Sequence, residues 1–129
     1  MSYGDTYLLS IFGIDLGEEA LTELLKIYYT DTYLELLHDI YKIKNYITMR
    51  GIGKYEIIAY GGDVILSLKK YEYNITNSGL KKAPIPSSME INNFFEFCEK
   101  INHHLAEEYE NLIDIKDYNL YMIFVEEED

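Results

Sequence analysis

A β-hairpin is predicted by residues 55–75, which read YEIIAYGGDVILSLKKYEYNI. Two runs rich in β-branched and aromatic residues flank Gly61-Gly62, and two glycines can adopt the positive φ angles of a tight turn. We therefore expect a hairpin over about 54–75. In its second strand, Val64, Leu66 and Leu68 share one parity, whereas Tyr71, Tyr73 and Ile75 share the other. Because one strand cannot keep both sets on one face, we expect a bulge or a strand break near Lys69 and Lys70.

Two helices are predicted upstream of the hairpin. Asp15 opens a capping-box pattern, and apolar residues three and four apart follow it, which predicts a helix over about 16–29. A second capping box at Thr32 opens a helix that ends near Tyr46. The short joint between them favours two helices packed as a hairpin. Before them, the apolar residues 7–12 form either a strand or a first helical turn, because so short a run has no decisive periodicity.

The C-terminal part of the chain holds its clearest helix pattern. Ser87 and Glu90 form a third capping box, and the amphipathic pattern that follows predicts one long helix over about 88–112. A strand over about 118–125 is apolar at odd and even positions, which is typical of an interior strand buried on both faces. Residues 76–88 contain both prolines and are predicted to form the longest loop.

These elements predict a single α+β domain over residues 1–129. We expect a small, mainly antiparallel sheet that combines the hairpin with the C-terminal strand, packed with the N-terminal helical hairpin and the long amphipathic helix. The one cysteine, Cys98, excludes an intramolecular disulfide and a zinc site built from cysteines. Because Cys98 lies on the apolar stripe of the long helix, we expect a buried and unreactive thiol.

A cytoplasmic location is predicted from the absence of targeting patterns. The first residues carry no basic cluster followed by a long apolar run, as a secretory signal would. No stretch approaches the roughly 20 apolar residues that a membrane-spanning helix needs.

Acidic side chains dominate the charge of the chain, with 23 acidic against 11 basic residues and a net charge of −12. Residues 90–129 hold twelve of the acidic residues and two of the basic ones. This charge disfavours non-specific attraction to nucleic acid or to an anionic membrane. On the predicted long helix, we interpret one outer face as a partner-binding surface, because carboxylates at this spacing can stand in for a row of phosphates; a solvated helix face is the alternative. The surface consists of Glu96, Glu99, His103, Glu107, Glu110 and Asp114.

Catalytic signatures are lacking. His103, His104 and Glu107 are the nearest to a cluster of metal-ligating type, but two ligands from one helical turn make only half of a zinc site. No HExxH motif, nucleophile elbow or phosphate-binding loop occurs. We therefore predict no catalytic residue, no metal and no cofactor. A small metal-dependent or acid–base enzyme that uses these three residues is the alternative.

We predict a small non-enzymatic inhibitor whose acidic surface blocks a basic partner protein, either a nucleic-acid-handling enzyme or a nuclease toxin. A viral anti-defence protein, such as an anti-CRISPR protein that acts as a DNA mimic, fits these features. An immunity protein that neutralises a nuclease toxin fits them equally well. A structural or assembly subunit of a virus is a further alternative. We expect no direct binding to nucleic acid or membrane, and an edge strand of the hairpin could support a homodimer.

Overall fold

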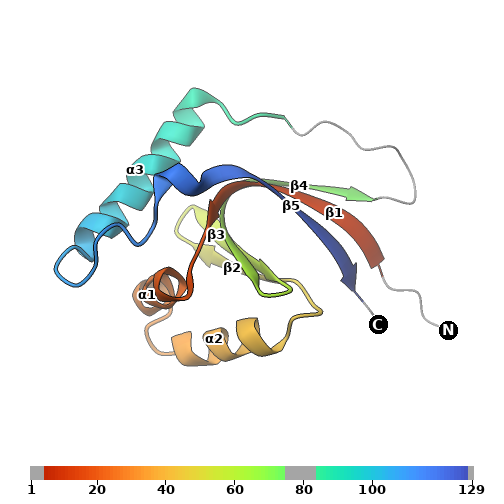
Figure 1. Cartoon of the computed structure of the whole chain (residues 1–129), viewed down its shortest axis with the longest axis horizontal. Coiled ribbons are helices and arrows are strands. Elements are labelled where there is room, and N and C mark those ends of the chain that lie inside the picture. The colour runs from red at the N-terminus through yellow and green to blue at the C-terminus, as the bar shows by residue number, and fades with distance from the viewer. Residues whose placement is uncertain (1–4, 75–83, 128–129) are drawn as a thin grey trace.

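The computed structural model describes residues 5–74 and 84–127, in which strands and helices form an α+β fold (Figure 1). The fold class predicted from the sequence is thereby confirmed. The strands are β1 (Asp5–Asp15), β2 (Thr48–Ile52), β3 (Tyr55–Tyr60), β4 (Asp63–Asn74) and β5 (Tyr118–Glu127). The helices are α1 (Glu18–Tyr28), α2 (Tyr33–Lys42) and α3 (Ser88–His104), and a 3-10 turn (Ile115–Asp117) precedes β5.

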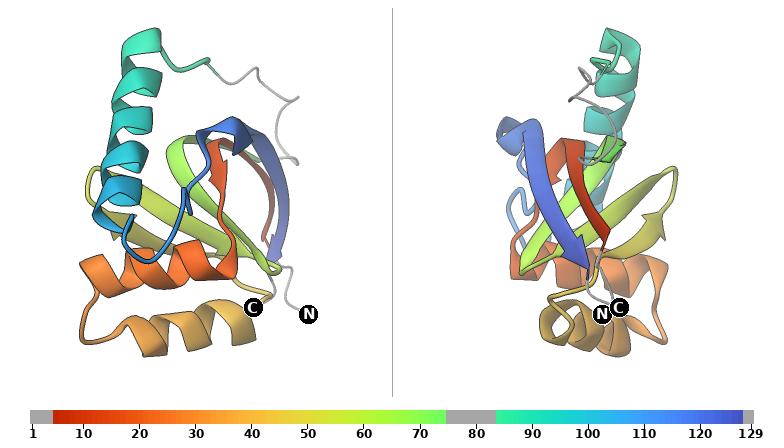
Figure 2. Two further views of the ribbon diagram at one scale, coloured as in Figure 1. Left: turned by 60° about the vertical axis from the view of Figure 1, so that its left-hand side comes forward. Right: turned by 90° about the vertical axis from the view of Figure 1, so that its right-hand side faces the viewer.

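The five strands form one antiparallel sheet in the order β2-β3-β4-β1-β5. The N-terminal segment is therefore an interior strand, and β2 is a strand that the sequence did not predict. The sheet is curled, as the two views of Figure 2 show. The Tyr60 hydroxyl in β3 bonds to the backbone N–H and C=O of Glu126 in β5, both at 3.1 Å, although β4 and β1 lie between these strands.

Apolar side chains fill both faces of the curled sheet. On one face, Leu24 of α1 and Phe94 of α3 pack on Leu66 of β4, and all three side chains are fully buried. On the other face, the strands pack against one another around Leu9 and Ile58. Because the strands supply the second cluster by themselves, the helices are needed on one face only.

The predicted hairpin and its irregularity are confirmed. β3 and β4 join at Gly61 and Gly62, whose φ angles are 63° and 96°. β4 carries one unpaired residue, Leu68, where its register with β1 shifts between Phe12 and Gly13. Both hairpin strands are interior, so the expectation that an edge of the hairpin supports a homodimer is wrong. The edges of the sheet are β2 and β5.

The helix starts agree only partly with the predicted capping boxes. Asp15 is the last residue of β1 and caps no helix, because α1 begins at Glu18 and Gly17 occupies its N-cap position. Thr32 stands at the N-cap position of α2, but its side chain makes no capping bond, and α2 ends at Lys42.

The third capping box is confirmed in full. The Ser87 side chain accepts from the Glu90 N–H at 3.1 Å, and the Glu90 carboxylate accepts from the Ser87 N–H at 3.0 Å. The same carboxylate pairs with Lys69 of β4 at 2.6 Å, so the first turn of α3 is tied to the sheet.

The last strand lies at an edge of the sheet, so the prediction that it is buried on both faces is wrong. Ile123 and Val125 join the inner cluster. The side chains of Leu120, Met122 and Phe124 point to the other face and are 39%, 61% and 56% exposed. The loop predicted over 76–88 lies mostly outside the described residues. None of the described helices is long and apolar enough to cross a membrane.

Candidate functional site

The acidic residues predicted to share one helix face belong to two different structures, because α3 ends at His104 rather than near Leu112. Beyond His104 the chain turns back toward the sheet, and Asn111 adopts a positive φ of 45° on the way. We call residues 105–114 the return segment. Leu105 and Leu112 keep a helical spacing in the sequence, but they reach the core from this segment. The predicted helix over 88–112 is therefore corrected to Ser88–His104.

Two side chains hold the return segment in place. The Asn102 amide of α3 donates to the Ile113 carbonyl at 2.7 Å and accepts from the Ile113 N–H at 3.0 Å. The Tyr109 hydroxyl donates to the Glu23 carboxylate of α1 at 3.2 Å. Ile113 itself is 1% exposed. The segment is thus attached to α3, to α1 and to the core, which fixes where its acidic side chains lie.

Three of the six predicted site residues meet around one hollow of about 480 Å³. α3 supplies Glu99 and His103, and the return segment supplies Glu110. All three side chains are exposed. We call this site the acidic hollow; the other residues that line it are Asn102, Ala106, Tyr109 and Asn111.

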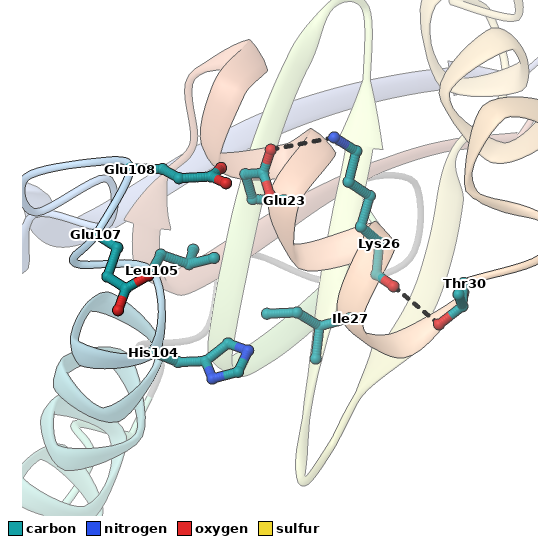
Figure 3. Close-up of a pocket in the computed structure, with 8 residues that line it drawn as sticks. All are labelled: Glu23, Lys26, Ile27, Thr30, His104, Leu105, Glu107 and Glu108. Carbon is teal, nitrogen blue, oxygen red and sulfur yellow. Dashed lines mark hydrogen bonds and ion pairs between the residues drawn. The ribbon is translucent and has the colours of Figure 1, made fainter.

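Glu107 lines a second hollow of about 480 Å³, between α1 and the end of α3 (Figure 3). Glu108 and His104 line it with Glu107, and α1 contributes Glu23 and Lys26. The Glu23 carboxylate is mostly buried and bonds to Lys26 Nζ at 3.3 Å as well as to Tyr109. Its negative charge is the main cause of a raised pKa of the Tyr109 phenol, which therefore keeps the proton that it donates.

The remaining two predicted site residues lie apart from both hollows. Glu96 stands further back on α3, where it pairs with Lys100 at 3.5 Å beside the basic side chain of Lys54. The Asp114 side chain accepts from the Lys116 N–H at 2.9 Å and so caps the 3-10 turn. These two residues already have structural partners.

Several acidic side chains at the end of α3 have no cationic partner among the described residues, as is also true of others such as Glu18 and Glu72. Among the described residues, four carboxylates pair with lysines, namely those of Glu23, Glu56, Glu90 and Glu96. Over residues 5–74 and 84–127, no ion pair is found for Glu99, Glu107, Glu108 or Glu110. We call these four residues the acidic surface.

The residues of the alternative enzyme site are not brought together. His103 lines the acidic hollow, whereas His104 and Glu107 line the hollow beside α1. Within the described parts of the chain, no three His, Cys, Asp or Glu side chains are grouped so that they could hold a metal ion. The geometry therefore gives the enzyme alternative no support.

Cys98 should resist thiol reagents in the folded protein. Its side chain is fully buried, and burial is the main cause that raises the pKa of the thiol from 9.0 to about 12. An aromatic disulfide reagent at pH 8 should therefore label the native protein only as fast as it opens, and the unfolded protein at once. Rapid labelling of the native protein would contradict this placement.

The same thiol makes stability depend on pH. The folded thiol keeps its proton up to about pH 12, while the unfolded thiol loses it near its ordinary pKa of 9.0. The folded state then binds more protons than the unfolded state, so this group should lower the stability as the pH rises from 9.0 to 12.

Four residues that build the site were not predicted as part of the partner-binding surface: Glu23, Asn102, Glu108 and Tyr109. Glu108 follows Glu107 directly, and the charge run could have indicated it once the helix was known to end. No sequence signal connects Glu23 with Tyr109, because their contact joins α1 to the return segment.

Comparisons of the chain with protein-family models, with curated protein sequences and with solved structures find no match.

Proposed function

We propose that this protein is a non-enzymatic inhibitor whose acidic surface occupies a basic site on a partner protein. The observation that carries the proposal is the group of four exposed carboxylates at the end of α3, for which no ion pair is found within residues 5–74 and 84–127. Like charges held close together repel, and each such pair costs a few tenths of a kcal/mol in an isolated helix. A partner that supplies Lys or Arg side chains would relieve this repulsion.

The position of these carboxylates near the C-terminus of α3 also favours a basic partner. Unpaired backbone carbonyls give the C-terminal end of a helix a partial negative charge, and acidic side chains are unfavourable there. α3 nevertheless ends beside Glu107, Glu108 and Glu110. The helix end and these side chains therefore add up to one region of negative potential, which attracts a basic surface over about 10 Å at moderate salt.

The partner's chemistry follows from this potential. Basic grooves that normally hold nucleic acid present Lys and Arg side chains to phosphates, and carboxylates can occupy the same positions. Suitable partners are a nucleic-acid-handling defence enzyme and a nuclease toxin. The protein would accordingly act either as a viral anti-defence protein or as an immunity protein.

A charge-reversal experiment tests the proposal. The wild-type protein is immobilised, and basic proteins retained from a lysate of the encoding organism are identified. The double variant Glu99→Lys, Glu110→Lys should bind the retained partner at least about tenfold more weakly, because both charges of the acidic hollow are inverted. Duplex DNA should compete with the wild-type protein for the partner, and binding should weaken as salt rises from about 0.05 to about 0.5 M.

The control is the double variant Asp63→Lys, Glu72→Lys, which changes the net charge equally. Both residues are exposed and lie on β4, away from the return segment. This variant should bind the partner as the wild type does, apart from a small long-range effect. Equal binding by the wild type and by the Glu99→Lys, Glu110→Lys variant would show that the acidic surface is only solvated, and a partner that DNA does not displace would exclude mimicry.

A further inference from the structure

Another hollow combines aromatic rings with a basic rim, and it shares no lining residue with the two hollows described above. It lies between α3 and the turn that joins β2 to β3, and its volume is about 370 Å³. Phe97 and Tyr55 supply the rings, and Lys54 and Lys100 supply the cations. Its surface is mainly apolar. An apolar hollow of this size with a few polar groups is the usual form of a small-molecule site.

The aromatic part of this hollow is held in place by the core. Tyr55 packs edge-on against Phe97, with ring centroids 4.9 Å apart, and against Phe94, with centroids 5.0 Å apart. Phe94 is fully buried, so it fixes Tyr55 and, through Tyr55, the ring of Phe97. Phe97 itself remains partly exposed. A ligand therefore meets a ring that is already in position, which lowers the entropic cost of binding.

The turn between β2 and β3 leaves one side of the Phe97 ring uncovered. Gly53 adopts a φ of 61°, which suits a tight turn and which other residues rarely adopt. A Cβ atom at Gly53 would lie 3.4 Å from the Phe97 ring and 3.4 Å from the Tyr28 hydroxyl. Because glycine has no side chain, the space beside the ring stays open.

Both lysines of the rim can turn toward an anion. Over the described residues 5–74 and 84–127, no ion pair is found for Lys54. Lys100 pairs with Glu96 at 3.5 Å, but these side chains are 77% and 62% exposed, and an exposed pair contributes little. Two cations and one anion give the hollow a net charge of +1, whereas the whole chain carries −12.

We propose that this hollow binds a small planar aromatic anion, in which a ring carries a carboxylate or a phosphate group. The ring lies against Phe97 in the space beside Gly53, and the anionic group contacts Lys54 and Lys100. A ring surface alone would accept any apolar compound, and exposed lysines alone would hold an anion weakly. The two together select a ligand that has both features. The site does not depend on the acidic surface, because the two share no residue.

Amide chemical shifts of the purified protein test the site with three probes. Indole-3-acetate represents aromatic carboxylates, and adenosine monophosphate represents aromatic phosphates, so the tighter of these two anions identifies the source. That anion should bind with a dissociation constant of about 1 mM or lower and shift the amides of residues 53–55 and 93–100. Tryptamine has an indole ring but a positive charge, and it should bind at least about tenfold more weakly.

Substitutions separate the contribution of the charge from that of the ring. Lys54→Glu should weaken binding of the tighter anion at least about tenfold, because it inverts one charge of the rim. Lys44→Glu makes the same change at an exposed lysine outside the hollow and should leave binding unaffected. Phe97→Leu keeps an apolar side chain but removes the ring, and it should weaken binding by roughly three- to tenfold. Circular dichroism verifies that each variant is folded.

Three results would overturn the proposal. Neither anion shifts the amides of residues 53–55 and 93–100 at concentrations up to about 5 mM. A folded Lys54→Glu or Phe97→Leu variant binds the tighter anion as the wild type does. Tryptamine binds as tightly as that anion. None of these results affects the proposed inhibitor function, whose test uses Glu99 and Glu110.

Discussion

Replacing Gly13 with alanine should lower the free energy of unfolding by about 3 kcal/mol, at the upper end of what overpacking costs. A Cβ atom at this position would clash with the Leu66 carbonyl oxygen and would lie 3.1 Å from the Ile65 side chain. The oxygen belongs to the backbone of β4, which cannot rotate away as a flexible side chain would. β1 is enclosed by β4 and β5, so the strand has no open side toward which it could shift.

Urea unfolding followed by circular dichroism measures this loss, which corresponds to a melting temperature lower by roughly 10 °C. Gly51→Ala is the matched control, because it also adds one methyl group to a strand glycine. Nothing lies within 4 Å of a Cβ atom at Gly51, so its stability should stay equal or rise by about 0.5 kcal/mol. Similar stabilities of the two variants would show that β1 has room for a side chain at Gly13, opposite the bulge in β4.

The hairpin was predictable because its determinants are local. Gly61-Gly62 specifies the turn, and the change of apolar parity around Lys69 indicates the bulge. Ser87 and Glu90 likewise specify the start of α3 through two bonds within one turn. The capping box predicted at Asp15 does not form, which shows the limit of such patterns. Asp15 lies in β1, two residues before the N-cap position of α1, which Gly17 occupies.

Strand order was not predictable from periodicity. The apolar residues of β5 predicted burial on both faces, but burial requires neighbours, and β1 is the one strand of the described sheet that pairs with β5. The even-numbered side chains around Met122 are consequently exposed. An apolar strand can signal an interior position or a surface that another chain covers, and the pattern by itself does not separate these two cases.

The candidate site was predicted in its charge but not in its shape. Three of the predicted residues, Glu99, His103 and Glu110, do meet around one hollow. They meet because the chain reverses after His104, although an unbroken helix was expected. The reversal depends on contacts between distant parts of the chain, and apolar spacing carries no information about them.

Asn102 makes one of these contacts between distant parts of the chain, and Asn102→Leu is the second substitution for which we expect a large loss of stability. The substitution keeps the approximate volume of the side chain but removes both bonds to the Ile113 backbone, at 2.7 Å and 3.0 Å. Each buried backbone group left without a partner costs about 1–3 kcal/mol, so the free energy of unfolding should fall by about 3 kcal/mol. The amide of Ile113 should also exchange with solvent faster, because the return segment loses its attachment to α3.

Asn93→Leu on the same helix is the control, because it makes the same change of residue type without removing the bonds to Ile113. Asn93 is exposed, and the substitution there should alter stability by no more than about 0.5 kcal/mol. If Asn102 positions the acidic surface, the Asn102→Leu variant should also bind the basic partner more weakly at temperatures where it remains folded, because Glu107, Glu108 and Glu110 then lose their fixed arrangement. Unchanged exchange at Ile113 together with unchanged stability would show that core packing of Ile113 holds the return segment without the Asn102 amide.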